Sequence, residues 1–253
     1  MPKPPIKVWL LFFTVFLLFL YPHAQKYSFK NYLAVNGLAS STVNHIFQDS
    51  RGYTWFATQG GGISRFNGKD FKNFNHADGL CSNDATCITE DRNGNIWIGT
   101  AEGVSEFNGT TFTTYNQSNG LPSGVVYDIY CDVNNRIWMA LHDGGIRVFD
   151  GKRFDSITTK DGLPSNEAYC ITLDKQGNYW FGLANGIAKY SHGKISSYSE
   201  AKYIKGKTFF SAMTGTDGNV WLGSTTGDVI IIHPDNAMEK LELPIALNHD
   251  FIG

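Results

Sequence analysis

The chain has 253 residues, a formal net charge of −2 and a hydrophobic fraction of 42%. This length is sufficient for one globular domain with a substantial core after a short leader. Positive and negative charges are scattered along the sequence, so no basic face for nucleic acid is expected.

Residues 1–24 are predicted to be a signal peptide. Lys3 and Lys7 precede a 13-residue apolar run, residues 8–20, which only Thr14 interrupts. A membrane span needs about 20 apolar residues, so this run is too short to be one. The prediction places the rest of the chain, residues 25–253, in the periplasm. An uncleaved anchor is the alternative, because Pro22 is a poor fit where a small residue usually precedes cleavage.

Residues 27–32 repeat a pattern that returns later in the chain. The segment 28–32 matches residues 70–74, and the Asn-Gly-Leu at 36–38 matches Asp-Gly-Leu at 78–80. We therefore expect an isolated strand at 27–32 that is equivalent to the last strand of a repeat unit.

Tryptophans mark five repeats after that strand, at intervals of 42, 41, 42 and 41 residues: Trp55, Trp97, Trp138, Trp180 and Trp221. The predicted units span residues 43–74, 85–115, 125–157, 168–198 and, in a degenerate form, 208–243. The tail at 247–252 resembles the start of a sixth unit. A period near 40 residues is typical of solenoids and propellers.

The second unit shows what each repeat contains. Four runs rich in aromatic and β-branched residues, at 85–90, 96–100, 104–107 and 111–115, are separated by turn residues. Asn108-Gly109 is a strong hairpin signal, because both residues tolerate positive φ. The sequence therefore predicts an all-β fold, a β-propeller of four-stranded antiparallel blades, with five units and the start of a sixth. In a ring, the strand at 27–32 would complete the last blade; a five-bladed ring with a loose tail is the alternative.

Three positions in the unit are expected to be structural. Each tryptophan should fill the space between neighbouring sheets, where an aromatic side chain buries roughly 150–250 Å². A small residue two places later should let the next sheet approach: Ala57, Gly99, Ala140, Gly182 and Gly223. An aspartate six places earlier should cap the turn: Asp49, Asp91, Asp132 and Asp174. The fifth unit has Gly215 there and Asp217 instead, so we expect its turn to differ.

Most of the four cysteines are predicted to be small core residues rather than disulfide partners. Cys87 and Cys170 hold equivalent positions in units that are not adjacent, and Cys131 holds another position. Residues 201–208 loosely match a phosphate-binding loop, but a strand is expected after them where such a loop requires a helix. We interpret this segment as an altered crossing between two units.

The repeated motifs resemble the two-component regulator propeller repeats. The resemblance rests on Gly-Leu-(Cys/Pro)-Ser before an innermost strand at 79–82, 120–123 and 162–165, then Asp-x-x-Gly-x-x-Trp or a close variant, and then a Gly-rich hairpin. It covers essentially all of residues 27–232. Such repeats form periplasmic sensor regions of bacterial hybrid histidine kinases, which implies an incomplete seven-bladed ring and a fragment of a longer sensor. It also implies a small ligand, in many members an oligosaccharide, self-association through the propeller, and a membrane-attached kinase output in cis or trans. Nothing in the chain resembles the kinase.

Strand alternation places two kinds of segment at one end of the blades: the loop between the second and third strands, and the crossing to the next blade. We call this the crossing face and the opposite end the hairpin face. Loops on a rigid scaffold commonly carry binding residues. The predicted ligand-binding residues are Gln59, Asn83, Asp84, Glu102, His142, Asp143, Asn166, Glu167 and Asn185. The alternative is that the crossing side chains bond their own backbone.

No catalytic residue, metal site or cofactor is predicted. The histidines are spread over different units without local metal-ligand spacing, and the Asp-rich turns lack the bidentate Glu of a calcium loop. A ring can still bring distant histidines together, so a propeller enzyme similar to streptogramin lyases is one alternative function. A protein-interaction platform is the other.

Overall fold

A computed structural model describes residues 29–122 and 124–242. The chain divides into two compact units, Met1–Asn31 and Tyr32–Gly253. Of the first, residues 29–31 are described and have no regular secondary structure. The predicted signal peptide and the predicted start of a sixth unit at 247–252 lie outside the described residues.

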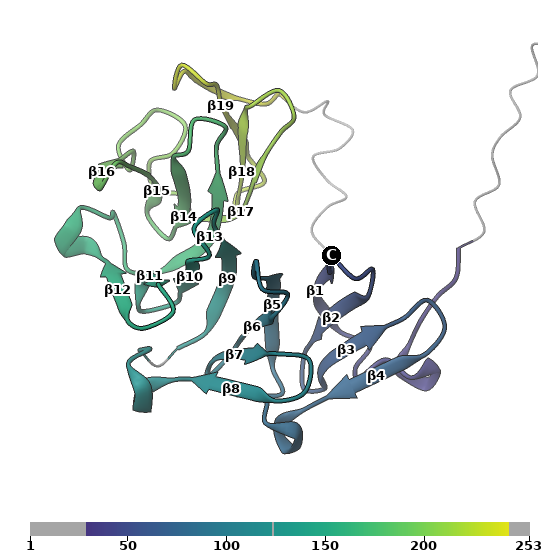
Figure 1. The fold of residues 1–253 in the computed structure, drawn as a ribbon. Helices are drawn as coiled ribbons and strands as arrows, with labels where there is room; N and C mark the ends of the chain where they lie inside the picture. Colours follow the sequence, from purple (N-terminus) through teal and green to yellow (C-terminus); the bar gives the residue numbers. More distant parts are fainter. Residues whose placement is uncertain (1–28, 123, 243–253) are drawn as a thin grey trace, which may run out of the picture. The chain divides into compact units, whose positions relative to one another are not determined.

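The second unit contains five four-stranded antiparallel sheets, each built from consecutive strands (Figure 1). The first sheet comprises β1 (Val43–Gln48), β2 (Thr54–Thr58), β3 (Gly62–Phe66) and β4 (Phe71–Phe74). The second comprises β5 (Ala85–Glu90), β6 (Ile96–Thr100), β7 (Gly103–Phe107) and β8 (Phe112–Tyr115). The third comprises β9 (Val126–Cys131), β10 (Ile137–Leu141), β11 (Gly145–Phe149) and β12 (Phe154–Ile157).

The fourth sheet comprises β13 (Ala168–Leu173), β14 (Tyr179–Leu183), β15 (Gly186–Ser191) and β16 (Lys194–Ser197). The fifth comprises β17 (Phe209–Thr214), β18 (Val220–Ser224), β19 (Val229–Ile232) and β20 (Met238–Lys240). Each sheet carries one of the five tryptophans on its second strand. The predicted all-β fold of four-stranded blades is confirmed.

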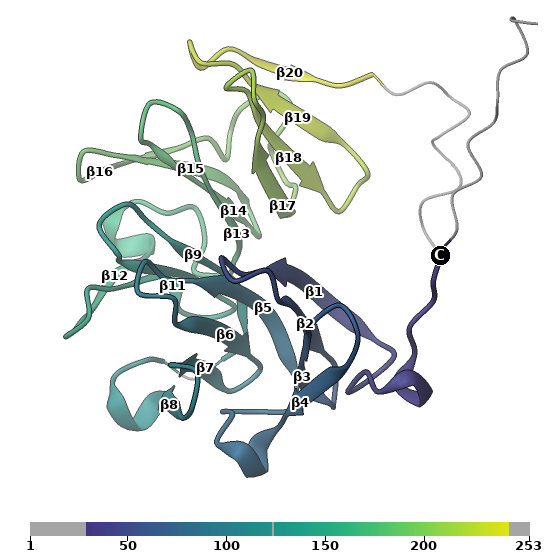
Figure 2. The same ribbon diagram turned by 45° about the vertical axis from the view of Figure 1, so that its right-hand side comes forward.

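The first strands of successive sheets contact one another in the order β1, β5, β9, β13 and β17. Figures 1 and 2 show these strands toward the middle of the second unit, with β4, β8, β12 and β16 at its periphery. This arrangement is that of propeller blades around a common centre.

The predicted strand at 27–32 is not formed in its described part, because residues 29–32 have no strand structure. A strand needs a partner, and none of the five described sheets includes this segment. Closure of a ring by this segment therefore stays a prediction.

Short 3-10 helices precede the first four sheets, one before each: η1 (Ala34–Asn36), η2 (His76–Asp78), η3 (Gln117–Asn119) and η4 (Thr159–Asp161). In the crossing that contains η2, the Asn75 side chain accepts a bond from Ala77 N, and Asp78 accepts one from Asn75 N. Gly79 then adopts φ 104°, a left-handed conformation that favours glycine. The chain thereby turns inward and buries Leu80.

The tryptophans pack between sheets as predicted. Trp55 is fully buried and stacks on Phe74 of its own sheet, while its ring also meets Phe107 of the second sheet edge-on. Trp138, in the third sheet, stacks on Tyr179 of the fourth sheet, with ring centroids 3.9 Å apart. Trp221, in the degenerate fifth sheet, is partly exposed.

The small residue on the second strand has the predicted role in the second and fourth sheets. A Cβ atom added to Gly182 would lie 2.6 Å from the carbonyl oxygen of Phe209, which belongs to the next sheet. One added to Gly99 would lie 3.0 Å from a methyl group of Val126, again in the next sheet. Glycine is required at these two positions because the second strand lies so close to the innermost strand of the next sheet.

The cysteine prediction is confirmed, since all four thiols are free. Cys81, Cys87 and Cys170 are buried, and burial raises the pKa of the Cys87 and Cys170 thiols far above the ordinary value. Residues 201–206 form turns and bury Ile204, so the segment that loosely matches a phosphate-binding loop opens no helix.

Candidate functional site

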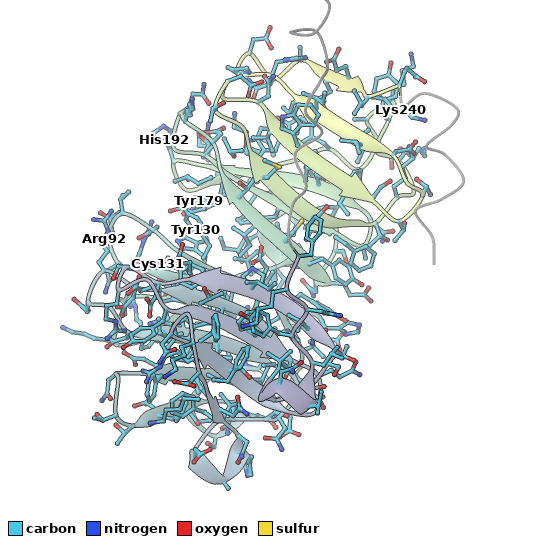
Figure 3. The ribbon with its side chains drawn as sticks, turned by 90° about the vertical axis from the view of Figure 1, so that its right-hand side faces the viewer. Arg92, Tyr130, Cys131, Tyr179, His192 and Lys240 are labelled. Carbon is cyan, nitrogen blue, oxygen red and sulfur yellow. The ribbon has the colours of Figure 1, made fainter. Side chains whose placement is uncertain are left out.

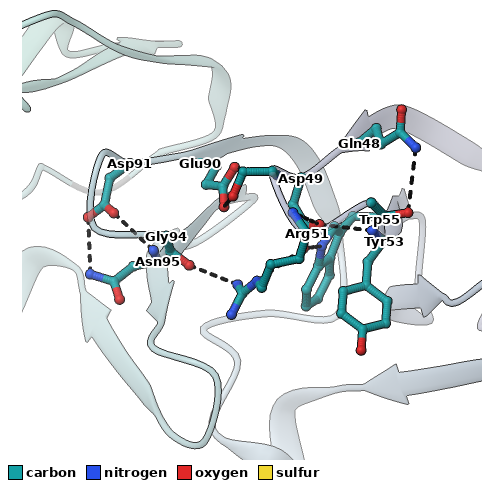
Figure 4. Close-up of polar contacts among 11 residues, drawn as sticks. Gln48, Asp49, Arg51, Tyr53, Trp55, Glu90, Asp91, Gly94 and Asn95 are labelled. Carbon is teal, nitrogen blue, oxygen red and sulfur yellow. Dashed lines mark hydrogen bonds and ion pairs between the residues drawn. The ribbon is translucent and has the colours of Figure 1, made fainter.

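The hairpin face is occupied by contacts that hold the molecule together. Asp49 accepts bonds from the backbone N–H groups of Arg51 and Tyr53, as predicted for a turn cap. Its second oxygen accepts the indole N–H of Trp55 at 2.9 Å (Figure 4). The sequence analysis missed this second bond, because it depends on how the hairpin folds the tryptophan back toward the aspartate.

The same bond recurs in the next three sheets, with distances from the indole nitrogen to the carboxylate oxygen between 2.9 and 3.2 Å: Trp97 to Asp91, Trp138 to Asp132 and Trp180 to Asp174. In the fifth sheet Asp217 bonds Asn219 instead, so that turn differs as expected.

Turns of neighbouring sheets are also bonded to each other on the hairpin face. Arg51 donates from Nη2 to the carbonyl of Gly94 at 2.8 Å, and Glu90 accepts two bonds from Ser50 at 2.7 Å (Figure 4). Farther along, Arg92 N donates to Asn135 Oδ1 at 2.7 Å. The polar groups of this face thus mainly serve contacts between sheets.

Arg92, Tyr130, Cys131, Tyr179 and His192 lie along one side of the molecule in Figure 3, which belongs to the hairpin face. Asp132 is the central acceptor there. Burial alone would raise its pKa, but bonds from Trp138, Arg136 and Tyr179 outweigh that effect and lower it. This carboxylate is therefore held ionised in a structural role.

Backbone bonds join the segments of the crossing face in pairs. Gly62 N, after β2, donates to the carbonyl of Asn83 at 2.8 Å, and Gly145 N donates to the carbonyl of Asn166 at 2.7 Å. The loop after each second strand therefore lies against the crossing into the next sheet, as the sequence analysis expected.

Three of the predicted ligand-binding side chains serve this local structure. Asn83 accepts a bond from His76 N at 2.7 Å, Asn166 accepts one from Thr159 N at 2.9 Å, and Asp84 accepts one from Gly60 N at 2.8 Å. Their structural roles match the alternative given for the crossing residues. A ligand would have to share these oxygens with the backbone.

Three other predicted residues are exposed and make no side-chain hydrogen bond within the described part of the chain: Gln59, Glu102 and Asn185. They lie in the loops after the second strands of three different sheets. Their amide and carboxylate groups are available for bonds with a ligand, although the structure does not bring them into one cluster.

His142, Asp143 and Glu167 do come together, around two tyrosines. His142 Nδ1 lies 3.0 Å from Asp143 Oδ2, and its ring centroid lies 5.8 Å from that of Tyr127. Tyr169 donates its hydroxyl proton to Glu167 Oε2 at 3.2 Å. Tyr127 and Tyr169, on β9 and β13, were not predicted, because the sequence analysis considered only polar loop residues.

Four described histidines, His45, His76, His142 and His233, have separate local partners, for example Leu80 O for His76 and Asn219 for His233. Within the described residues no group of three metal-ligating side chains is close enough to hold an ion.

A hollow of about 540 Å³ lies elsewhere, between the outer strands of the second and third sheets. Tyr115, Phe149 and Phe154 line it together with Lys152 and Arg153. No described helix has the length and apolarity of a membrane span.

The two-component regulator propeller model matches four segments of the chain, residues 37–60, 79–102, 120–143 and 162–185. Each segment runs from the glycine before a buried leucine, through the Asp–Trp hairpin, to the loop after the second strand. The four segments end at Gly60, Glu102, Asp143 and Asn185, on the crossing face.

Solved structures with the same fold include extracellular domains of two hybrid two-component systems from B. thetaiotaomicron. For BT4673 the TM-score is 0.70 at 23% identity, over 80% of this chain and 31% of that one. For BT3049 it is 0.61 at 21% identity, over 78% of this chain and 34% of that one. The chain therefore spans about a third of the length of these sensor domains.

Virginiamycin B lyase from Staphylococcus aureus also shares the fold, with a TM-score of 0.68 at 18% identity over 88% of this chain and 76% of the lyase. No curated protein matches this chain. At these identities the structural neighbours establish the propeller fold alone.

Proposed function

Because the chain carries four copies of the two-component regulator propeller repeat, we propose that it is a ligand-sensing propeller module of an exported two-component sensor. The repeat family and the fold shared with extracellular sensor domains support this assignment. Residues 1–24 would direct export to the periplasm, and a histidine kinase attached to the membrane would provide the output, in cis or in trans.

The observation that carries the proposal is the difference between the two faces. The hairpin face uses its carboxylates and turn residues to bond neighbouring sheets, as Arg51 and Asp132 illustrate. On the crossing face, Gln59, Glu102 and Asn185 remain exposed. Exposed side chains on a rigid scaffold can change partners without a cost in folding, which suits a binding surface.

The proposed ligand is a small soluble molecule, and an oligosaccharide is the class that these side chains suit. Amides, carboxylates and an imidazole, such as those of Asn185, Asp143 and His142, can donate to or accept from hydroxyl groups. Binding would signal by favouring one packing arrangement of propellers or protomers over another, and a ligand can shift such an equilibrium only by its difference in affinity for the two states.

The test is a binding assay of the protein against a panel of soluble oligosaccharides, with Asp143→Ala as the variant. We expect folding to be unchanged and affinity for the recognised sugar to fall. Asp155→Ala is the matched control, because that carboxylate is also exposed but lies on β12 at the periphery. Equal affinities of the wild type and the Asp143 variant would count against the crossing-face site.

A propeller enzyme is the second candidate, because a lyase shares the fold over most of both chains. His142 would be its catalytic group, being partly exposed beside Asp143. Undiminished turnover of any substrate by His142→Ala would exclude that role. A protein-interaction platform is the third candidate, and it predicts a protein partner without a small ligand.

A further inference from the structure

Every innermost strand contains a β-bulge at the same place. In β13, Ala168 pairs with Leu183 and Cys170 pairs with Gly182, so Tyr169 between them has no partner on β14. The register shifts equivalently in the other four sheets. A bulge bends the strand and can re-aim a side chain. The five bulged residues are Asn44, Thr86, Tyr127, Tyr169 and Phe210.

The first two bulged residues bond the next sheet. Asn44 Nδ2 donates to the carbonyl of Ala85 at 2.8 Å, and the Thr86 hydroxyl donates to the carbonyl of Val126. These bonds connect the first sheet to the second and the second to the third. In these two positions the bulge has a structural use.

The last three bulged residues are aromatic and contact one another instead. The ring centroids of Tyr127 and Tyr169 lie 4.9 Å apart, and those of Tyr169 and Phe210 lie 4.2 Å apart. We call Tyr127, Tyr169 and Phe210 the aromatic row. It runs across three sheets at the crossing-face end of the innermost strands.

The aromatic row is accessible to solvent. Phe210 is 48% exposed, and both tyrosines are partly exposed. A single exposed aromatic residue needs no explanation, but a contiguous row of three is the kind of surface that marks a binding site. Polar side chains connect neighbouring sheets at the Asn44 and Thr86 positions, so the fold does not demand an aromatic residue at a bulged position.

The charged groups beside the row are carboxylates. Glu167 accepts the Tyr169 hydroxyl at 3.2 Å, and Asp143 is 72% exposed next to His142. Burial and then the charge of Glu167 raise the pKa of Tyr169, and Asp143 contributes to the same effect. By contrast, Lys207 and Lys240 are each held by Asp228 at 2.6 Å. The surroundings of the row therefore favour a positive charge.

We propose that the aromatic row binds the ammonium group of a small organic cation, with Glu167 and Asp143 as its counter-charges. The faces of tyrosine and phenylalanine rings attract cations, most strongly where water is displaced, and quaternary ammonium ions are recognised in this way. The inference rests on the proposed function in one respect, that the crossing face is the ligand-binding face, and it adds an ammonium group to the chemistry that this face would recognise.

The experiment compares choline with 3,3-dimethylbutan-1-ol, which has the same shape and no charge. Binding to the full chain is followed by NMR titration or calorimetry. We expect choline to bind about tenfold more tightly, since a cation–π contact of roughly 1.4 kcal/mol corresponds to that ratio. Equal affinity for the two compounds would overturn the proposal and leave an apolar surface only.

Variants separate the row from the rest of the protein. Tyr169→Leu and Phe210→Ala are each expected to weaken choline binding about tenfold, and Glu167→Gln severalfold, while Tyr169→Phe keeps the ring and most of the affinity. Val133→Ala is the control, an exposed apolar residue in the β9–β10 turn on the hairpin face, and should change nothing. Thermal unfolding verifies that each variant is folded.

Two further outcomes would each overturn the proposal. One is undiminished choline binding by the folded double variant Tyr169→Leu/Phe210→Ala. The other is a protein that does not bind choline but binds neutral oligosaccharides, with an affinity that Asp143→Ala lowers. This second outcome would leave the proposed sensing function intact. Failure of the oligosaccharide assignment is recognised separately, by choline binding in a protein that binds no oligosaccharide of the panel.

Discussion

Tyr179 in the fourth sheet donates its hydroxyl proton to Asp132 in the third sheet, over a distance of 2.9 Å. The same carboxylate oxygen accepts the indole N–H of Trp138 at 3.0 Å, and Arg136 donates to it from Nε at 2.7 Å. One buried carboxylate thus closes a hairpin turn, orients a core tryptophan and bonds the next sheet. The other three turn aspartates have no equivalent of Tyr179, because the aliphatic residues Ile96, Ile137 and Val220 take its position in the sheets that follow them.

Replacing Asp132 with alanine should therefore be among the more destabilising changes in the turns. It leaves the N–H of Trp138 and the hydroxyl of Tyr179 buried without an acceptor, at about 1–3 kcal/mol for each unsatisfied group. We expect a loss of about 2–4 kcal/mol in urea unfolding. Asp217→Ala in the fifth sheet is the control and should cost less than about 1 kcal/mol. Similar losses in the two variants would contradict the role of Asp132.

Replacing Trp97 with alanine tests the packing between sheets. Trp97 is 3% exposed, stacks on Tyr115 and contacts Phe149 of the third sheet. Truncating such a residue typically costs about 3–5 kcal/mol. Trp221→Ala should cost clearly less, because Trp221 is partly exposed. An unchanged melting temperature for the Trp97 variant would refute the packing role.

Replacing Gly182 with alanine tests the close approach of β14 to β17, the innermost strand of the next sheet. The new methyl group would press on the carbonyl of Phe209, which is backbone and cannot rotate away. Overpacking of this kind costs about 1–3 kcal/mol. At Gly223 the equivalent methyl group would meet only the Ser211 hydroxyl. That side chain is exposed and can rotate, so Gly223→Ala should be nearly neutral; a larger loss at Gly223 than at Gly182 would be inconsistent with this account.

Asp128 should make stability depend on pH. Burial raises its pKa to about 6, against bonds from the N–H groups of Ile171 and Ile129. Between its unfolded value of 3.8 and about 6 the folded state binds the extra proton, so stability falls as the pH rises through this window and levels off above it. The loss of folding stability across this window is at most about 3 kcal/mol, since a difference of one pH unit in pKa corresponds to about 1.4 kcal/mol. The partial exposure of the Asp128 side chain makes the expected loss smaller.

Urea unfolding at pH 4 to 8 measures this effect, with Asp128→Asn as the variant. The amide does not titrate, so its stability should decline less steeply with pH than that of the wild type. Asp155→Asn, at a more exposed carboxylate, should keep the wild-type slope. Parallel curves of unfolding free energy against pH for the wild type and the Asp128 variant would show that Asp128 does not contribute to the pH dependence of stability.

The strands of the second unit could be predicted to within about one residue because their signals are local. In the second unit the predicted runs 85–90 and 96–100 coincide with β5 and β6. Alternating apolar residues, Asn-Gly turns and the tryptophan period do not depend on distant partners. The hydrogen bond between Asp49 and Trp55 could not be predicted from local sequence patterns, because it depends on the side-chain positions that the folded hairpin creates.

Some sequence relationships become intelligible only in the folded molecule. Ser105 Oγ accepts the backbone N–H of Cys81 in the crossing before its sheet, as Ser64 does for Ala39. In the next two crossings prolines 122 and 164 replace these donors, and proline has no N–H to offer. The third strands there carry arginine 147 and alanine 188 instead of serine. The residue types at two positions more than 20 residues apart therefore change together, because one hydrogen bond joins these positions where both partners are present.

The sequence by itself determined the repeat, the four strands of each blade, the turn aspartates and the burial of four of the five tryptophans, since each follows from short-range patterning and hydrophobicity. Only the tertiary structure decided which face is occupied by contacts between sheets and which bulged residues meet. Tyr127, Tyr169 and Phe210 are separated by about 40 residues each, and no local pattern brings their rings together. The stacking of successive sheets does so, because it aligns the same bulge of each innermost strand.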